Sequence, residues 1–167
     1  MGRSDAWGEL TFQALTPPWE PALELFRFVG AWAPPAGQIE WAWGLQDDER
    51  LRGALVAERT GTNAMLHGPV VVAPADTSPD SALEVAGELL TRWLRHVETA
   101  GVDTVFARPQ GLDRIWVRHG FIPMPEAELP KPLRGRPGTG LFGWRGGTAL
   151  WSAAGRGNSR GRAQARS

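Results

Sequence analysis

The sequence predicts a single α/β domain (α+β in its segregation) built on a mixed, mainly antiparallel sheet. Three apolar segments between residues 39 and 73 are joined by short polar turns, which is the spacing of antiparallel hairpins. A long run from residue 79 to 97 follows with helical spacing, and residues 102–107 form another apolar strand. The strand, long helix and second strand make a βαβ unit, so these two strands are expected to be parallel.

The first half of the chain reads as a strand, a helix and three hairpin-connected strands. Residues 9–15 alternate apolar and polar side chains, and residues 21–32 predict a short helix that opens at a proline. Alternation then marks strands at residues 39–45 and 51–58, and a polar turn leads into a third strand at residues 64–73. Together these segments supply the antiparallel part of the sheet.

The centre of the chain is a strand, a tight turn and a long helix. Val70–Val72 is a stiff, β-branched run typical of a buried strand, and Pro74 marks its end. Ser78 followed by Pro79 is a helix-start signature, and Gly101 is a good C-terminal stop. A helix that begins beside the end of a central strand presents free N–H groups, and phosphates bind such places.

The remainder predicts short elements and then a tail. In order, these are a strand at 102–107, an amphipathic helix at 111–119, a strand at 121–124, a Pro- and Gly-rich loop at 126–140, and a hairpin of 141–144 with 148–151 around Gly146-Gly147. We expect Trp116 to pack on the sheet together with Leu112 and Ile115. Residues 1–152 therefore form the domain, and residues 153–167, composed only of Ala, Gly, Arg, Ser, Asn and Gln, form a disordered tail.

Composition narrows the function classes. The formal net charge is zero, and the four arginines of the tail lack any aromatic neighbour, so nucleic acid is not an expected partner. The absence of cysteine excludes a disulfide scaffold, a thiolate metal site and a cysteine nucleophile, and no metal motif occurs. No apolar run approaches the ~20 residues that span a bilayer, and the N-terminus lacks a signal-peptide core, so we expect a cytoplasmic protein without a membrane partner.

Two local stretches resemble a known family. Val72-Ala73-Pro74 is similar to the Val-x-Pro end of the central strand in GNAT acyltransferases. Trp116-Val117-Arg118-His119-Gly120-Phe121 resembles the family's Tyr-x-x-x-Gly-Phe, with Trp116 where tyrosine usually stands. With the order of elements, this resemblance covers Glu9 to Trp151 and implies a GNAT-like fold.

The resemblance implies transfer of an acetyl or other acyl group from acyl-coenzyme A to a small or peptidic amine. Acetyl-CoA, or another acyl-CoA, would then be the co-substrate. Its pyrophosphate would lie at the start of the long helix, on Thr77, Ser78, Ser81 and Ala82. Its pantetheine would follow the strand edge at Val70, Val71 and Val72, where a backbone N–H polarises the thioester carbonyl.

The sequence departs from the family pattern at the phosphate loop. Where the family has Arg/Gln-x-x-Gly-x-Gly/Ala, this chain has Thr77-Ser78-Pro79-Asp80-Ser81-Ala82, and only Ala82 matches. No glycine lets the backbone approach a pyrophosphate, and Asp76 and Asp80 oppose a phosphate by charge. The alternative function is therefore a non-catalytic GNAT-like binding or interaction module that has lost coenzyme A. The oligomeric state stays open, with a homodimer as one option.

His67 is the first candidate for a catalytic base and Glu58 is the second. A histidine titrates near neutrality, and its strand borders the expected cleft, although a half-buried structural residue is the alternative. Strand alternation places His67 on the face of Met65 and Val71 unless a bulge intervenes. A bulge at Gly68-Pro69 would change that register.

Overall fold

The computed structural model describes residues 7–110 and 115–146. Leu112, the expected strand at 148–151 and the expected tail at 153–167 lie outside these residues. The described elements are β1 (Leu10–Ala14), α1 (Glu20–Val29), η1 (Ala36–Gln38), β2 (Trp41–Asp47), β3 (Arg50–Thr60), β4 (Asn63–Val71), α2 (Pro79–Thr99), β5 (Thr104–Ala107), α3 (Ile115–Arg118), β6 (Ile122–Pro123), η2 (Glu126–Glu128), η3 (Lys131–Leu133) and β7 (Phe142–Arg145).

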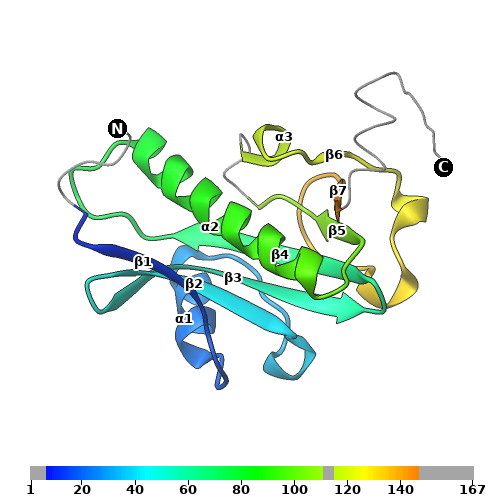
Figure 1. Cartoon of the computed structure of the whole chain (residues 1–167), viewed down its shortest axis with the longest axis horizontal. Coiled ribbons are helices and arrows are strands. Elements are labelled where there is room, and N and C mark those ends of the chain that lie inside the picture. The colour runs from blue at the N-terminus through cyan, green and yellow to red at the C-terminus, as the bar shows by residue number, and fades with distance from the viewer. Residues whose placement is uncertain (1–6, 111–114, 147–167) are drawn as a thin grey trace.

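The strands of the described residues form one mixed sheet in the order β1-β2-β3-β4-β5-β7-β6. β1 to β4 pair antiparallel, whereas β4 and β5 pair parallel on either side of α2 in the sequence. This confirms the predicted α/β domain with a central strand–long helix–strand unit. Figure 1 shows α2 lying across one face of the sheet and α1 on the opposite face.

The face under α2 carries the main hydrophobic core. Side chains of α2 that are shielded from solvent, among them Leu89 and Trp93, pack on Leu66 and other strand residues. Trp116 is 2% exposed, belongs to this core and meets Phe121 edge-on at a ring distance of 5.2 Å. The predicted packing role of Trp116 is therefore confirmed.

Among the described residues, no helix combines the length and the apolar character needed to cross a membrane.

Two separate elements cover the other face of the sheet. α1 buries Phe26 against Val56 and Val70, while the segment containing η2 and η3 buries Leu133 against Met65. The two clusters have no member in common. Glu58 of β3 and His67 of β4 lie on this same face, because Glu58 pairs with Met65 and His67 with Val56.

α1 ends earlier than the sequence analysis predicts. Its last residue is Val29, not Trp32, because Gly30 adopts a left-handed conformation with φ of 75°. The N–H groups of Gly30 and Ala31 donate to the carbonyls of Arg27 and Phe26 at 3.1 and 2.9 Å, which closes the helix. The prediction was wrong because it extended the apolar pattern through a glycine that is a natural helix stop. The early end allows the next residues to cross the sheet.

β4 contains a bulge at Gly68-Pro69, the second of the two registers that the sequence left open. Val56 pairs with His67 and Ala54 with Val70, so β4 holds one residue more than β3 over this stretch, and the register shifts. Gly68 takes a φ of 94° inside the bulge. Val70 consequently packs in the α1 cluster and Val71 against the α2 core. The alternative without a bulge, with His67 and Val71 on one face, is excluded.

Candidate active site

A gap opens in the sheet where β4 leaves β5. The parallel pairing of the two strands stops at Leu66 with Ala107, whereas β4 continues to Val71. The N–H of Val72 donates to the carbonyl of Arg52 on β3 at 2.7 Å. Successive N–H groups of an extended strand point to opposite neighbours. The N–H of Val71 therefore points away from β3 and into the gap.

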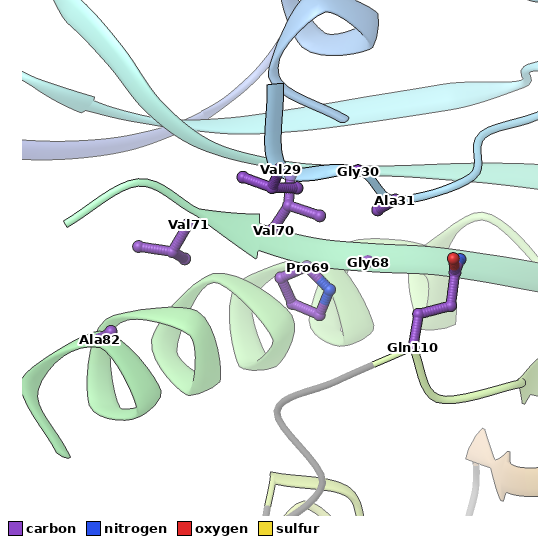
Figure 2. Close-up of a pocket in the computed structure, with 9 residues that line it drawn as sticks. All are labelled: Val29, Gly30, Ala31, Gly68, Pro69, Val70, Val71, Ala82 and Gln110. Carbon is purple, nitrogen blue, oxygen red and sulfur yellow. The ribbon is translucent and has the colours of Figure 1, made fainter. Parts of the chain in front are cut away.

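A cavity of about 210 Å³ occupies this gap. Figure 2 shows its lining on both sides of β4, with the end of α1 on one side and the start of α2 on the other. Every lining side chain is uncharged; the residues are Val29, Gly30, Ala31, Gly68, Pro69, Val70, Val71, Ala82 and Gln110. Such a cavity suits a slender, largely apolar chain.

A pair of hydrogen bonds between Gln110 and Trp32, called the bracket below, lies beside the gap. The side-chain carbonyl Oε1 of Gln110 accepts from the N–H of Trp32 at 2.9 Å, and Nε2 of Gln110 donates to the carbonyl of Trp32 at 3.2 Å. The bracket ties the segment after α1 to the loop after β5. The ring of Trp32 lies edge-on to that of His67, with 5.2 Å between ring centroids.

The two candidate bases lie in direct contact. Nε2 of His67 is 2.7 Å from Oε2 of Glu58, and each residue is only 4% exposed. The contact follows from the register, since Val56 pairs with His67 and Glu58 with Met65, which makes His67 and Glu58 diagonal neighbours on one face. From the sequence these residues are alternatives for the base, and the fold joins them into one pair.

Arg136 completes the group from a distant part of the chain. Its Nε donates to Oε2 of Glu58 at 2.9 Å and its Nη2 to Oε1 at 2.5 Å. Arg136 was not predicted from the sequence because it lies in the Pro- and Gly-rich loop, 78 positions from Glu58. The available signal was indirect, since a carboxylate on a buried strand face requires a cation somewhere in the chain.

Electrostatics set the charge of each member of the Arg136–Glu58–His67 cluster. Burial by itself would raise the pKa of Glu58, but the hydrogen bonds and charges of His67 and Arg136 outweigh it and lower the pKa from 4.5 to about 2. Burial lowers the pKa of His67 below 6.5, against the opposing effect of Glu58. Near neutral pH the cluster therefore holds an ionised Glu58 and a neutral His67.

The neutral imidazole is oriented as a proton acceptor. Because Nε2 faces an ionised carboxylate, it carries the proton and donates it, which leaves the lone pair on Nδ1. Nδ1 makes no hydrogen bond to the residues that the structure describes. An oriented neutral histidine with a free ring nitrogen is the usual form of a general base.

Most of the side-chain polar groups at the start of α2 already form hydrogen bonds within the protein. Oγ of Ser78 accepts from the N–H of Ser81 at 3.2 Å, and Oγ of Ser81 accepts from Nε1 of Trp7 at 2.7 Å. Thr77 donates its hydroxyl to the carbonyl of Pro74 at 2.8 Å, and Pro79 has no N–H. The gap at β4 thus fits the acyl-pantetheine end of coenzyme A, while the start of α2 offers few donors to its pyrophosphate.

Elsewhere among the described residues, neither Arg108 nor the histidine and acidic side chains provide a further ligand site. Arg108, which follows β5, donates to both carboxylate oxygens of Glu126 and to the carbonyl of Gly140. It is occupied in holding the loop that carries Arg136. Among residues 7–110 and 115–146, no cluster of histidine and acidic side chains is arranged to hold a metal ion.

Comparison with solved structures identifies the fold. No protein-family model and no curated protein matches the sequence. Of this chain, 83% aligns with 35% of N-acetylglutamate synthase from Neisseria gonorrhoeae, crystallised with coenzyme A and N-acetyl-glutamate, at a TM-score of 0.62 and 16% identity. An acetyltransferase of the GNAT family from Staphylococcus aureus Mu50 aligns over 82% of this chain and 99% of its own, at a TM-score of 0.61 and 10% identity.

A third structure agrees with these two. The ribosomal-protein-S18-alanine N-acetyltransferase from Escherichia coli aligns over 82% of this chain and 94% of its own, at a TM-score of 0.59 and 14% identity. The chain thus spans about a third of the synthase and nearly all of the two smaller enzymes. The strand order, the gap between β4 and β5 and these alignments lead to one conclusion: the chain has the fold of the GNAT acetyltransferase superfamily.

Proposed function

We propose that this protein is an acyl-CoA-dependent N-acyltransferase, with acetyl-CoA as the simplest donor. The observation that carries the proposal is the gap where β4 leaves β5, which is lined by uncharged residues and lies next to an oriented neutral histidine. The gap accommodates a pantetheine arm, and the histidine provides the base that amine acylation requires.

Val71, His67 and Glu58 have separate roles in the proposed transfer. The bound thioester supplies an activated acyl carbon and a thiol leaving group. The N–H of Val71 is oriented to polarise the acyl carbonyl, as a backbone donor does in an oxyanion hole. Nδ1 of His67 would take the proton of the acceptor nitrogen as the C–N bond forms, and the C–S bond would break to release coenzyme A as a thiolate that is protonated from solvent. Glu58 holds the imidazole in the required tautomer through Nε2.

The acceptor belongs to the class of primary amines. Two of the similar structures have names that specify an amino acid and a protein alanine as acceptors. A panel of amines should therefore contain free amino acids, peptide N-termini and small alkylamines. Release of free thiol from acetyl-CoA, measured against the rate without acceptor, identifies the class that is used.

Cofactor binding provides the first test. Because Asp76 and Asp80 oppose the pyrophosphate and few donors remain at the start of α2, we expect acetyl-CoA to bind in the micromolar range or more weakly, about −8 kcal/mol or less favourable. Asp80→Asn removes one negative charge and should tighten binding in calorimetry. Glu24→Gln, an exposed acid on α1, is the control and should change nothing.

The outcome that overturns the proposal is clear. If millimolar acetyl-CoA gives neither heat nor a shift of melting temperature in the wild type and in Asp80→Asn, the acyltransferase proposal falls. The non-catalytic interaction module then takes its place.

The base provides the second test. His67→Gln should lower turnover by about 100-fold or more, the usual contribution of a general base. The wild-type rate should fall on the acidic side as His67 becomes protonated, and this acidic limb should disappear in the mutant. A pH–rate profile of thiol release measures both effects. A mutant that keeps its rate and its acidic limb would remove His67 from the mechanism and transfer the role to Glu58.

A further inference from the structure

We propose that Arg136 is the positioning residue of this site: by neutralising Glu58, it leaves His67 uncharged, with the proton on Nε2 and the lone pair on Nδ1. The inference rests on the proposed function for its catalytic meaning. Its structural content, the protonation state of one imidazole, can be measured without any substrate.

The hydrogen bonds of Glu58 support the first step. Arg136 reaches both carboxylate oxygens, and His67 shares Oε2, so the carboxylate is held on two sides. A guanidinium bound in this forked manner fixes the carboxylate plane as well as its charge. Both oxygens of the Glu58 carboxylate already accept hydrogen bonds inside the protein, and its lowered pKa makes it a weaker base than His67. Within the cluster, Glu58 accepts the hydrogen bond that the Nε2–H group of His67 donates.

The anchoring of Arg136 supports the second step. Its Nη1 donates to the carbonyl of Arg134 at 2.6 Å and its Nη2 to the carbonyl of Pro132 at 3.0 Å. The loop itself is fixed by Leu133 of η3, which is 2% exposed and packs in the cluster with Met65 of β4. The guanidinium is therefore held in place before any ligand arrives, as positioning requires.

Charge balance supports the third step. A buried carboxylate requires a counter-charge, and among the described residues Arg136 and His67 are the side chains that hydrogen-bond or ion-pair with Glu58. Arg136 supplies that charge. Without it, the nearest available cation is an imidazolium formed by proton uptake at His67, and an imidazolium has no lone pair with which to act as a base. Arg136 thus decides whether His67 is a base or a counter-ion.

The test is nitrogen-15 NMR of the imidazole rings, which is practical because the chain has only three histidines. In the wild type at pH 7, we expect a neutral His67 with its proton on Nε2. Arg136→Gln should shift the titration of His67 to higher pH, because Glu58 then draws a proton onto the ring. Arg136→Lys keeps the positive charge but loses the forked hydrogen bonds. The pH at which its His67 titrates should therefore lie between those of the wild type and Arg136→Gln.

Arg134→Gln is the matched control. Arg134 lies in the same loop two positions away and donates its Nε to the carbonyl of Leu129, whereas the described hydrogen bonds of Glu58 are with His67 and Arg136. Its variant should titrate as the wild type does. A His67 that keeps the wild-type tautomer and titration in a folded Arg136→Gln variant would overturn the proposal.

A double variant covers the case in which Arg136→Gln does not fold. Glu58→Gln/Arg136→Gln has no unpaired buried charge, so it should fold and should titrate His67 at lower pH than Arg136→Gln. If Arg136→Gln fails to fold, a double variant that folds with a neutral His67 at pH 7 supports the charge argument. A double variant whose His67 is charged at pH 7 contradicts it.

Activity separates this inference from the proposed function. If the wild type transfers acyl groups, Arg136→Gln should move the acidic limb of its pH–rate profile to higher pH and lower turnover less than His67→Gln does. If the wild type transfers none, the NMR result still decides the role of Arg136. Unchanged NMR spectra in an active wild type and Arg136→Gln would reject the inference and leave the proposed function standing.

Discussion

At the scale of single residues, Gly68 determines where the candidate base sits. Its φ of 94° belongs to the left-handed region, and an added Cβ would lie 3.0 Å from Cζ of Phe26 and 3.1 Å from the carbonyl oxygen of Ala54. The bulge that separates His67 from Val70 depends on this residue, because only glycine adopts such a backbone without strain. The gap at β4 and the orientation of His67 therefore both depend on the left-handed backbone conformation of Gly68.

Gly68→Ala tests that requirement. We expect a loss of at least ~1 kcal/mol in the free energy of unfolding, the usual cost of a left-handed conformation for a residue with a Cβ. Urea denaturation measures it. Gly37→Ala is the control, since a Cβ there meets nothing within 4 Å and φ lies outside the left-handed region. Equal midpoints for the two variants would show that the bulge relaxes at no cost.

The site residues show which features a sequence reveals. His67 and Glu58 could be proposed as candidates because their residue types and strand positions are local information. Their mutual contact required the register of β3 against β4, and Arg136 required the path of a loop that ordinary turn chemistry does not determine. Long-range pairing of this kind depends on the packing of Leu133 and its neighbours, which no local pattern encodes.

At the scale of elements, local signals were sufficient where a helix had caps at both ends. α2 begins at Pro79 after the Ser78 cap and ends at Thr99, before Gly101, much as its sequence predicts. α1 was predicted too long, because its apolar pattern continues past Gly30. The parallel pairing of β4 with β5 followed from the βαβ rule, whereas the place where they separate did not.

α3 provides a test at this scale. Trp116→Ala should lower the free energy of unfolding by ~3–5 kcal/mol, the usual cost of deleting a large buried aromatic. Val117→Ala on the same helix is the control, since Val117 is 72% exposed and a surface change costs within about 0.5 kcal/mol. Chemical denaturation of both variants separates packing from helix propensity. An unchanged midpoint for Trp116→Ala would mean that α3 does not hold the core in solution.

At the scale of the whole molecule, the Arg136–Glu58–His67 cluster couples stability to pH. The pKa of Glu58 is lowered from 4.5 to about 2, so its contribution is complete above pH 4.5 and is lost as the pH falls through 2. The pKa of His67 is also lowered, so the unfolded chain binds protons more readily below pH 6.5 and stability decreases from there downward. Both groups therefore destabilise the fold on acidification.

Unfolding free energies measured from pH 7 to pH 3 test this coupling. In the wild type we expect a decrease that begins near pH 6.5 and steepens below pH 4.5. His67→Gln should remove the first part of the decrease and keep the second. A mutant curve parallel to that of the wild type would show that His67 titrates alike in the folded and unfolded chains.

The contact between Trp32 and His67 gives the protein an optical reporter of its own chemistry. A protonated imidazole quenches the emission of an adjacent indole far more than a neutral one does, and the two rings lie 5.2 Å apart. The emission lost in Trp32→Phe should therefore follow the charge of His67 as the pH changes, although the chain has nine tryptophans. Stopped-flow fluorescence of the wild type minus this variant would then show when the ring gains its proton.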